Sequence, residues 1–254
     1  MRVLYEEKEK VGKIILNNPE KVNPLSYETL CDLEKIIKNL AEERKVRVVI
    51  LTGAGKNFSA GHDLREIYER GPVEVEKLFL QCFKVMHAIR SAPQPFIAMV
   101  RGVAYAAGCQ LVAACDLAIA SENARFATPG VNIGLFCFTP IVFVSRNVSR
   151  KKAFELGILG EPLSAEEALR IGLVNKVVRD EELEKETGEF AKKIAEFPLE
   201  VLESGKRFFY GQIFMEDFSA LSFATEAIAL HSASRFAKEG IKAFLEKRKP
   251  VWGE

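Results

Sequence analysis

The chain has 254 residues, enough to bury one full hydrophobic core, and its 36 Lys and Arg residues almost match its 35 Asp and Glu residues. This balance produces no overall electric field that would attract nucleic acid or an anionic membrane, so we expect neither as a partner. The sequence has no run of roughly 18 apolar residues, which a membrane span needs, and no metal-ligand spacing among its five Cys and three His residues.

The first segment in chain order, MRVLYEEKEKVGKIIL, lacks the apolar core of a signal peptide and is too acidic for a typical transit peptide. The sequence therefore predicts a cytoplasmic protein. The mainly apolar segments 3–6 and 13–16 lie on either side of Gly12 and predict a β-hairpin. Ser26 is a typical N-cap, and apolar residues at helical spacing follow it. Residues 46–52 predict a strand that leads into a glycine-containing loop.

Residues 96–134 contain the pattern with the clearest chemical implication. Residues 96–100 form an apolar run typical of a buried strand, and small residues then lead into apolar residues at helical spacing, 111–114. A helix that starts among small residues leaves main-chain N–H groups unpaired, and such groups can bind an anion or stabilise an oxyanion. Small residues more often indicate close helix–sheet packing, so the pattern alone does not establish an anion or oxyanion site.

The alternation of strands, glycine-containing loops and helices predicts an α/β fold with parallel strand pairing. A capping box that begins at Ser164 and a short strand at 175–178 complete this part. Beyond that strand only helices are predicted, with a joint at Phe197-Pro198. We therefore expect a core of residues 1–197 and a C-terminal helical region of residues 198–254. The second part is so apolar that some of its surface should pack on the core or on another subunit.

Two motifs taken together resemble a known family. The first is VRVVILTGAGKNFSAGHDLREI at 46–67, and the second runs from residue 96 through LGILGEPLSAEEALRIGLVNKVV to residue 178. They are similar to the enoyl-CoA hydratase/isomerase, or crotonase, superfamily, and most of all to its third "enoyl-CoA hydratase domain-containing" subfamily. LNNPEKVNPLS near the start and EGIKAFLEKRKP near the end fit as well. The resemblance implies an α/β spiral of ββα units with a C-terminal helical region, a homotrimer or dimer of trimers, and a CoA thioester as substrate with no other cofactor.

The resemblance also implies which residues form the site. The family polarises the thioester carbonyl with two main-chain N–H groups, which correspond here to His62 and Ala107, the latter followed by Gly108. The coenzyme contacts correspond to residues at four further positions, Lys21, Ala60, Arg65 and Lys247, the last reaching the ligand of a neighbouring subunit. Asp63 is assigned to the same binding region and is also expected to cap the helix that begins at Leu64.

Three positions depart from the family pattern. Hydratases of this family use two glutamates, and the matching residues here are Gln110 and Gly130. Neither can deprotonate water or protonate a carbon, and acid–base help is worth about 10²–10⁴-fold in rate per group, so we do not expect efficient hydration. The third departure is Phe136, which together with Phe138 either narrows the acyl pocket or packs in the core.

The residues therefore leave three functions open. The chain is nominally a hydratase or isomerase that stabilises a thioester enolate. Alternatively, it decarboxylates a malonyl-type acyl-CoA, because loss of CO₂ creates the enolate without a base. A non-catalytic acyl-CoA binder or partner subunit is the third function. The His62 side chain is the one titratable group at an oxyanion position, and either a local hydrogen bond or a proton transfer near neutral pH would account for it.

Overall fold

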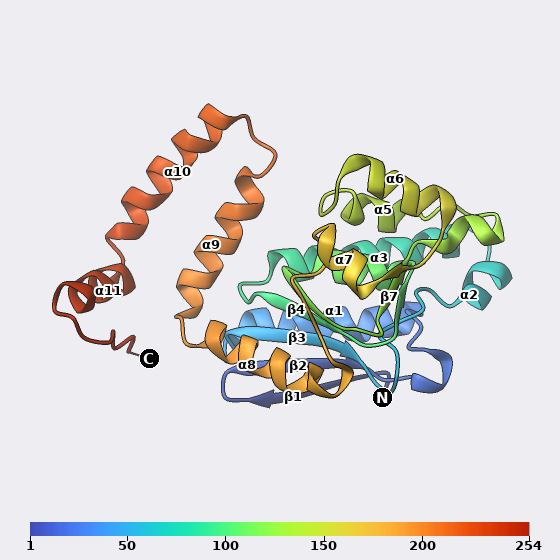
Figure 1. Cartoon of the computed structure of the whole chain (residues 1–254), viewed down its shortest axis with the longest axis horizontal. Coiled ribbons are helices and arrows are strands. Elements are labelled where there is room, and N and C mark those ends of the chain that lie inside the picture. The colour runs from blue at the N-terminus through green and yellow to red at the C-terminus, as the bar shows by residue number, and fades with distance from the viewer. Residues whose placement is uncertain (254) are drawn as a thin grey trace.

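The structure, a computed structural model, describes residues 1–253, and its centre is a twisted sheet (Figure 1). Near-continuous apolar runs, typical of strands buried on both faces, account for its inner strands. In spatial order its strands are β1 (Val3–Lys8), β2 (Val11–Leu16), β3 (Val48–Gly53), β4 (Phe96–Val100), β6 (Leu117–Ser121) and β9 (Lys176–Val178). β1 and β2 pair antiparallel, which confirms the predicted hairpin, and all later neighbours pair in parallel, as predicted.

A second, smaller sheet crosses one end of the first. Its strands are β5 (Val103–Tyr105), β7 (Arg125–Ala127) and β8 (Leu163–Ser164). An isolated parallel bridge between Ser59 and Ala104 ties the loop after β3 to β5. The spiral therefore brings the two glycine-containing loops of the sequence side by side.

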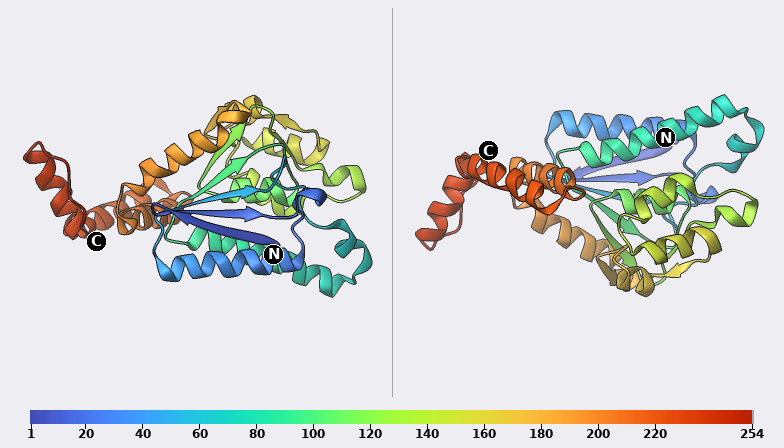
Figure 2. Two further views of the ribbon diagram at one scale, coloured as in Figure 1. Left: turned by 90° about the horizontal axis from the view of Figure 1, so that it is seen from below. Right: turned by 90° about the horizontal axis from the view of Figure 1, so that it is seen from above.

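Helices cover both faces of the main sheet (Figure 2). The helices of this part are α1 (Tyr27–Glu43), α2 (Leu64–Glu69), α3 (Pro72–Ser91), α4 (Ala107–Ala114), α5 (Phe138–Val144), α6 (Arg150–Leu159), α7 (Ala165–Arg170) and α8 (Leu183–Ala195). Strand residues alternate between the two faces, so one apolar cluster joins Val49 and Leu51 to α1, α3 and α4, while the other joins Val48 and Ile50 to α8.

Three predicted helix starts are confirmed by their capping hydrogen bonds. The Ser26 hydroxyl accepts from the Thr29 N–H, and Asp63 accepts from the Arg65 N–H. Ser164 and Glu167 form the complete capping box at the start of α7. Each bond satisfies a main-chain donor that the first helical turn leaves unpaired, which explains why these helices begin where they do.

The C-terminal helices follow a turn at Phe197-Pro198, as predicted. They are α9 (Leu199–Gln212), α10 (Asp217–Ser232) and α11 (Arg235–Leu245), and α10 and α11 extend away from the sheet (Figures 1 and 2). α9 is anchored to the core by Lys206, whereas α10 buries no residue. The apolar surplus of this region is therefore exposed within one chain. None of the helices among residues 1–253 is long and apolar enough to cross a membrane.

Candidate functional site

Two loops that carry predicted site residues abut each other. The Tyr105 N–H donates to the Ser59 carbonyl at 2.9 Å, and the chain continues on one side to His62 and on the other to Ala107. A Cβ atom placed on Gly61 would lie 3.0 Å from the Ala107 nitrogen. Gly61 also has a φ of +94°, a conformation that side-chain-bearing residues rarely adopt. Glycine at position 61 thus permits the close approach of the segments on which His62 and Ala107 lie.

Both predicted N–H donors lack a partner among residues 1–253. Ala107 is the first residue of α4, so its N–H has no acceptor within the helix, and no loop carbonyl or side chain accepts from it. The His62 N–H is likewise unpaired. Ala106, the residue before the second donor, has a φ of 48° and a ψ of −118°, and its N–H donates to the Ala127 carbonyl at 2.9 Å. Strain of this kind costs about 1–3 kcal/mol, persists only where the surroundings impose it, and is concentrated at functional sites.

An apolar cavity of about 520 Å³ opens beside these donors. This volume lies within the range of small-molecule sites, roughly 300–1,000 Å³. Residues 1–253 contribute no Asp, Glu, Lys or Arg side chain to its lining. Besides His62 and Ala107, the wall includes apolar and aromatic side chains from α2, α3 and residues 129–140, among them Ile67, Phe79, Pro129, Leu135, Phe136 and Phe138. The cavity therefore suits an apolar group better than a charged one.

The His62 imidazole forms part of the cavity wall. Its Nδ1 atom lies 3.0 Å from the Leu25 carbonyl oxygen, and its ring meets the Phe79 ring edge-on at a centroid distance of 4.9 Å. A carbonyl oxygen only accepts hydrogen bonds, so Nδ1 carries the proton and Nε2 holds a lone pair. Nε2 is buried and has no partner among the described residues. Burial lowers the pKa of His62 below its ordinary value, opposed by the bond to Leu25, so the ring is neutral at pH 7.

This lowered pKa gives the folding stability a pH dependence. Because the unfolded chain takes up a proton at His62 at a higher pH than the folded chain, the free energy of unfolding is expected to fall as the pH drops below about 6.5. The variant His62→Asn keeps a donor for the Leu25 carbonyl but does not titrate. Urea unfolding measured between about pH 7 and pH 5 should show a shallower loss of stability in this variant than in the wild type. Identical slopes in the two proteins would contradict the burial of a neutral ring.

Gln110, predicted as a catalytic position, does not line the cavity. It is 3% exposed on α4, and its Oε1 atom lies 4.0 Å from the Cys82 sulfur of α3. Every residue of α4 is buried, so the helix turns this side chain toward the core. Gln110 therefore belongs to the packing between α3 and α4 in this structure.

Gly130, the second departure from the hydratase pattern, does line the cavity but has no room for a side chain. A Cβ atom there would lie 2.5 Å from the Leu135 carbonyl oxygen and 2.9 Å from the Cys137 sulfur. The Gly130 N–H donates to that sulfur at 3.3 Å. The segment of residues 135–137 thus occupies the space that a side chain at position 130 would need.

Of the two phenylalanines in the same segment, Phe136 combines both predicted roles, and the cavity stays open. Phe136 lines the cavity and also packs against α6, because a Cβ atom on Gly157 would lie 3.0 Å from its ring. Phe138 is 72% exposed, and its ring meets that of Phe136 at a centroid distance of 5.2 Å. The sequence did not indicate Thr139, which lines the cavity and whose buried hydroxyl has no partner among residues 1–253. Its exposure to the cavity follows from how α5 packs, and no motif signals it.

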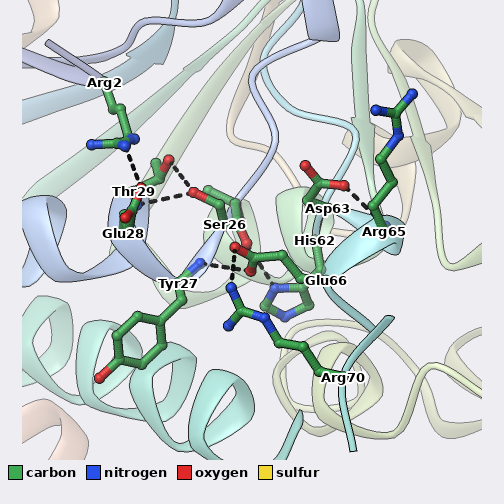
Figure 3. Close-up of polar contacts among 11 residues, drawn as sticks. Arg2, Ser26, Tyr27, Glu28, Thr29, His62, Asp63, Arg65, Glu66 and Arg70 are labelled. Carbon is green, nitrogen blue, oxygen red and sulfur yellow. Dashed lines mark hydrogen bonds and ion pairs between the residues drawn. The ribbon is translucent and has the colours of Figure 1, made fainter. Parts of the chain in front are cut away.

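The predicted coenzyme residues fall into two places. Ala60 lines the cavity, and its N–H donates to the carbonyl of Val22 at 2.9 Å, which places Lys21 close by. Arg65 is exposed on α2 and extends away from the His62 ring, while Asp63 caps that helix (Figure 3). Lys247 follows α11, at the opposite end of the molecule from α2 (Figure 1). Within one chain, Lys247 is therefore remote from the cavity.

Gly108, also predicted to bind substrate, packs closely on Ser59. A Cβ atom placed on Gly108 would lie 2.4 Å from the Ser59 carbonyl oxygen.

The model of the enoyl-CoA hydratase/isomerase family matches residues 6–254. The chain belongs to this family. Its fold matches that of human enoyl-CoA hydratase domain-containing protein 3, with a TM-score of 0.97 and 45% identity over 99% of this chain and all of that structure. The chain thus has the crotonase fold that the sequence motifs predicted.

Two further relatives are similar to this chain over nearly its whole length. The chain is 46% identical to the mitochondrial enoyl-CoA hydratase domain-containing protein 3 of Mus musculus over 243 residues, 95% of this chain and 81% of that protein. It is 35% identical to the short-chain-enoyl-CoA hydratase of Clostridium acetobutylicum over 249 residues, 97% of this chain and 95% of that protein. The predicted likeness to the third domain-containing subfamily is confirmed.

The predicted cytoplasmic location is wrong by the same comparison. The mouse, rat and human relatives that match this chain at 46–47% identity are mitochondrial proteins. The physical reason is that a compartment is set by a targeting segment that a receptor reads. The composition of a folded domain therefore does not determine its location.

Proposed function

We propose that the chain binds an acyl-CoA thioester and stabilises its enolate with the N–H groups of His62 and Ala107. The observation that supports this most is the pairing of two free main-chain donors on abutting segments, beside an apolar cavity of acyl size. Preorganised donors of this kind act at low dielectric and are each worth roughly 2.7–4 kcal/mol of barrier. Membership of the enoyl-CoA hydratase/isomerase family supports the same ligand class.

Within this proposal, hydration of an enoyl-CoA is slow. Adding water to the double bond needs one group to take a proton from water and one to give a proton to the α-carbon. The cavity lining of the described residues includes no carboxylate. Following the absorbance of crotonyl-CoA at micromolar protein, we expect turnover at least 100-fold below that of an enzyme with both glutamates. Turnover that equals such an enzyme would refute this part of the proposal.

A second candidate is decarboxylation of a malonyl-type thioester. The apolar cavity favours it because a substrate carboxylate placed there loses its hydration and is destabilised, and loss of CO₂ removes that charge from the cavity. The enolate that remains is stabilised by the two N–H donors. Incubation with methylmalonyl-CoA and measurement of released CO₂ tests this candidate. CO₂ release no faster than in buffer would exclude decarboxylation. The remaining functions would then be hydration, isomerisation, or binding without catalysis.

The variant Gly61→Ala tests the donor pair itself. A Cβ atom would lie 2.9 Å from that of Ala106 and would push apart the segments of His62 and Ala107. We expect acyl-CoA at about 100 times its Kd, which stabilises a binding protein by about 2.7 kcal/mol, to raise the Tm of the wild type but not of this variant. Gly205→Ala on α9, where a Cβ atom meets nothing within 4 Å, is the matched control. An unchanged response in Gly61→Ala would contradict the role of these donors.

For the C-terminal helices, we propose contact with further copies of the chain in a homotrimer or a dimer of trimers. The support is their unusual exposure of large apolar side chains, which include Phe209, Phe214, Phe218, Leu221, Leu230 and Phe244. Large exposed apolar patches on a protein surface mark interaction sites. Sedimentation velocity of the full chain measures the assembly, and a monomer at micromolar concentration would refute it.

The third candidate function is a non-catalytic acyl-CoA binder or partner subunit. Acyl-CoA binding without any product would favour it.

A further inference from the structure

The His62 side chain has four features that a purely structural histidine does not need to combine. It lines the cavity, its Nδ1–H is fixed on the Leu25 carbonyl at 3.0 Å, its Nε2 lone pair is buried, and that lone pair has no donor among residues 1–253. A buried acceptor left unpaired costs about 1–3 kcal/mol. The second nitrogen is therefore free to accept a proton, and because the atom is buried, a ligand reaches it only when the cavity wall beside the ring shifts.

We propose that His62 is the proton-transferring residue of this site, with Nε2 accepting a proton from the α-carbon of the bound thioester. This inference rests on the proposed function, because the acidity of that carbon depends on the two N–H donors. The same residue then serves twice, its main chain at the carbonyl oxygen and its imidazole at the neighbouring carbon.

The step balances within the site. The α-carbon–hydrogen bond breaks, its electron pair moves to the carbonyl oxygen as an enolate, and the proton forms a new N–H bond at Nε2. The bond from Nδ1–H to Leu25 holds the ring in the tautomer that leaves Nε2 free. Return of the proton from the imidazolium restores the thioester, and in deuterated water the returned nucleus is a deuteron.

The groups around the ring offer no competing base. Glu66 of α2 accepts from the Tyr27 N–H at 3.0 Å and pairs with Arg70 at 3.2 Å, as Figure 3 shows. Asp63 is occupied as the cap of α2. α3 presents the Phe79 ring. The other titratable side chain in the lining, Cys137, has its pKa raised by burial and is protonated at neutral pH.

The test uses butyryl-CoA, a saturated thioester that cannot be hydrated. Binding is measured by titration calorimetry, and exchange of the α-hydrogens in deuterated water is followed by mass spectrometry. His62→Asn keeps the main-chain N–H and a donor for Leu25 but lacks the distal nitrogen. His87→Asn, the same change at an exposed histidine of α3 outside the cavity, is the matched control.

We expect exchange by the wild type and by His87→Asn, with a rate that rises with pH through the His62 titration and then levels off. In His62→Asn we expect binding within a few-fold of the wild type and exchange lower by about 100- to 10,000-fold. If His62→Asn does not fold, the variant His62→Gln is measured in its place. Equal exchange in the folded His62 variants, or binding by the wild type without exchange, would overturn this inference alone. Absence of binding by the wild type would overturn the proposed function as well.

Discussion

Replacing Lys206 by methionine is expected to lower the free energy of unfolding by about 3 kcal/mol, because it leaves the largely buried Asp116 carboxylate without its counter-ion. The Lys206 ammonium is 6% exposed and lies 2.8 Å from Asp116 Oδ2. It also donates to the Ile89 carbonyl at 2.7 Å and to the Gln94 carbonyl at 2.9 Å. Urea unfolding near neutral pH measures the change.

The matched control for this prediction is Lys242→Met. The Lys242 ammonium lies 3.9 Å from Glu246 in an exposed ion pair one helical turn apart. Exposed pairs contribute about 0.2–1 kcal/mol, so this variant should differ little from the wild type. If both variants lost the same small amount, the buried pair would not be what holds α9 on the core.

The second large effect is expected at Gly130. We predict that Gly130→Glu loses about 3 kcal/mol or more of stability, because its side chain overlaps the main chain of residues 135–137 and buries a charge without a partner. For the same reason, adding Gln110→Glu to it should not create an efficient hydratase. Thermal unfolding and the crotonyl-CoA assay measure the two outcomes.

Gly188→Ala is the control for the steric argument. Gly188 lies within α8, and a Cβ atom there meets nothing within 4 Å. Alanine is favoured over glycine in a helix by up to about 1 kcal/mol, so this variant should be as stable as the wild type or more so. A folded Gly130→Glu protein with rapid hydration would show that the cavity wall yields to a glutamate and would refute our account of this position.

Local features of the sequence determined the elements and the family. Ser26 and Ser164 predicted helix starts correctly, because a cap bonds to an N–H only two or three residues away. The parallel sheet followed from the alternation of strands and helices, since parallel strands need such crossovers. The glycine-rich motifs identified the superfamily, and Gly61 stands where a φ of +94° and close packing exclude other residues.

The tertiary structure alone decided which side chains meet. Asp116 pairs with Lys206 and accepts from the Tyr210 hydroxyl at 2.8 Å, and no local pattern signals these partners, which lie about ninety positions along the chain. Likewise, the helix motif placed Gln110 at a catalytic position, whereas the burial of all of α4 turns it away from the cavity. Spacing along the chain predicts contacts over one or two helical turns. Contacts across the core depend on how helices pack on the sheet, and that packing is a property of the whole fold.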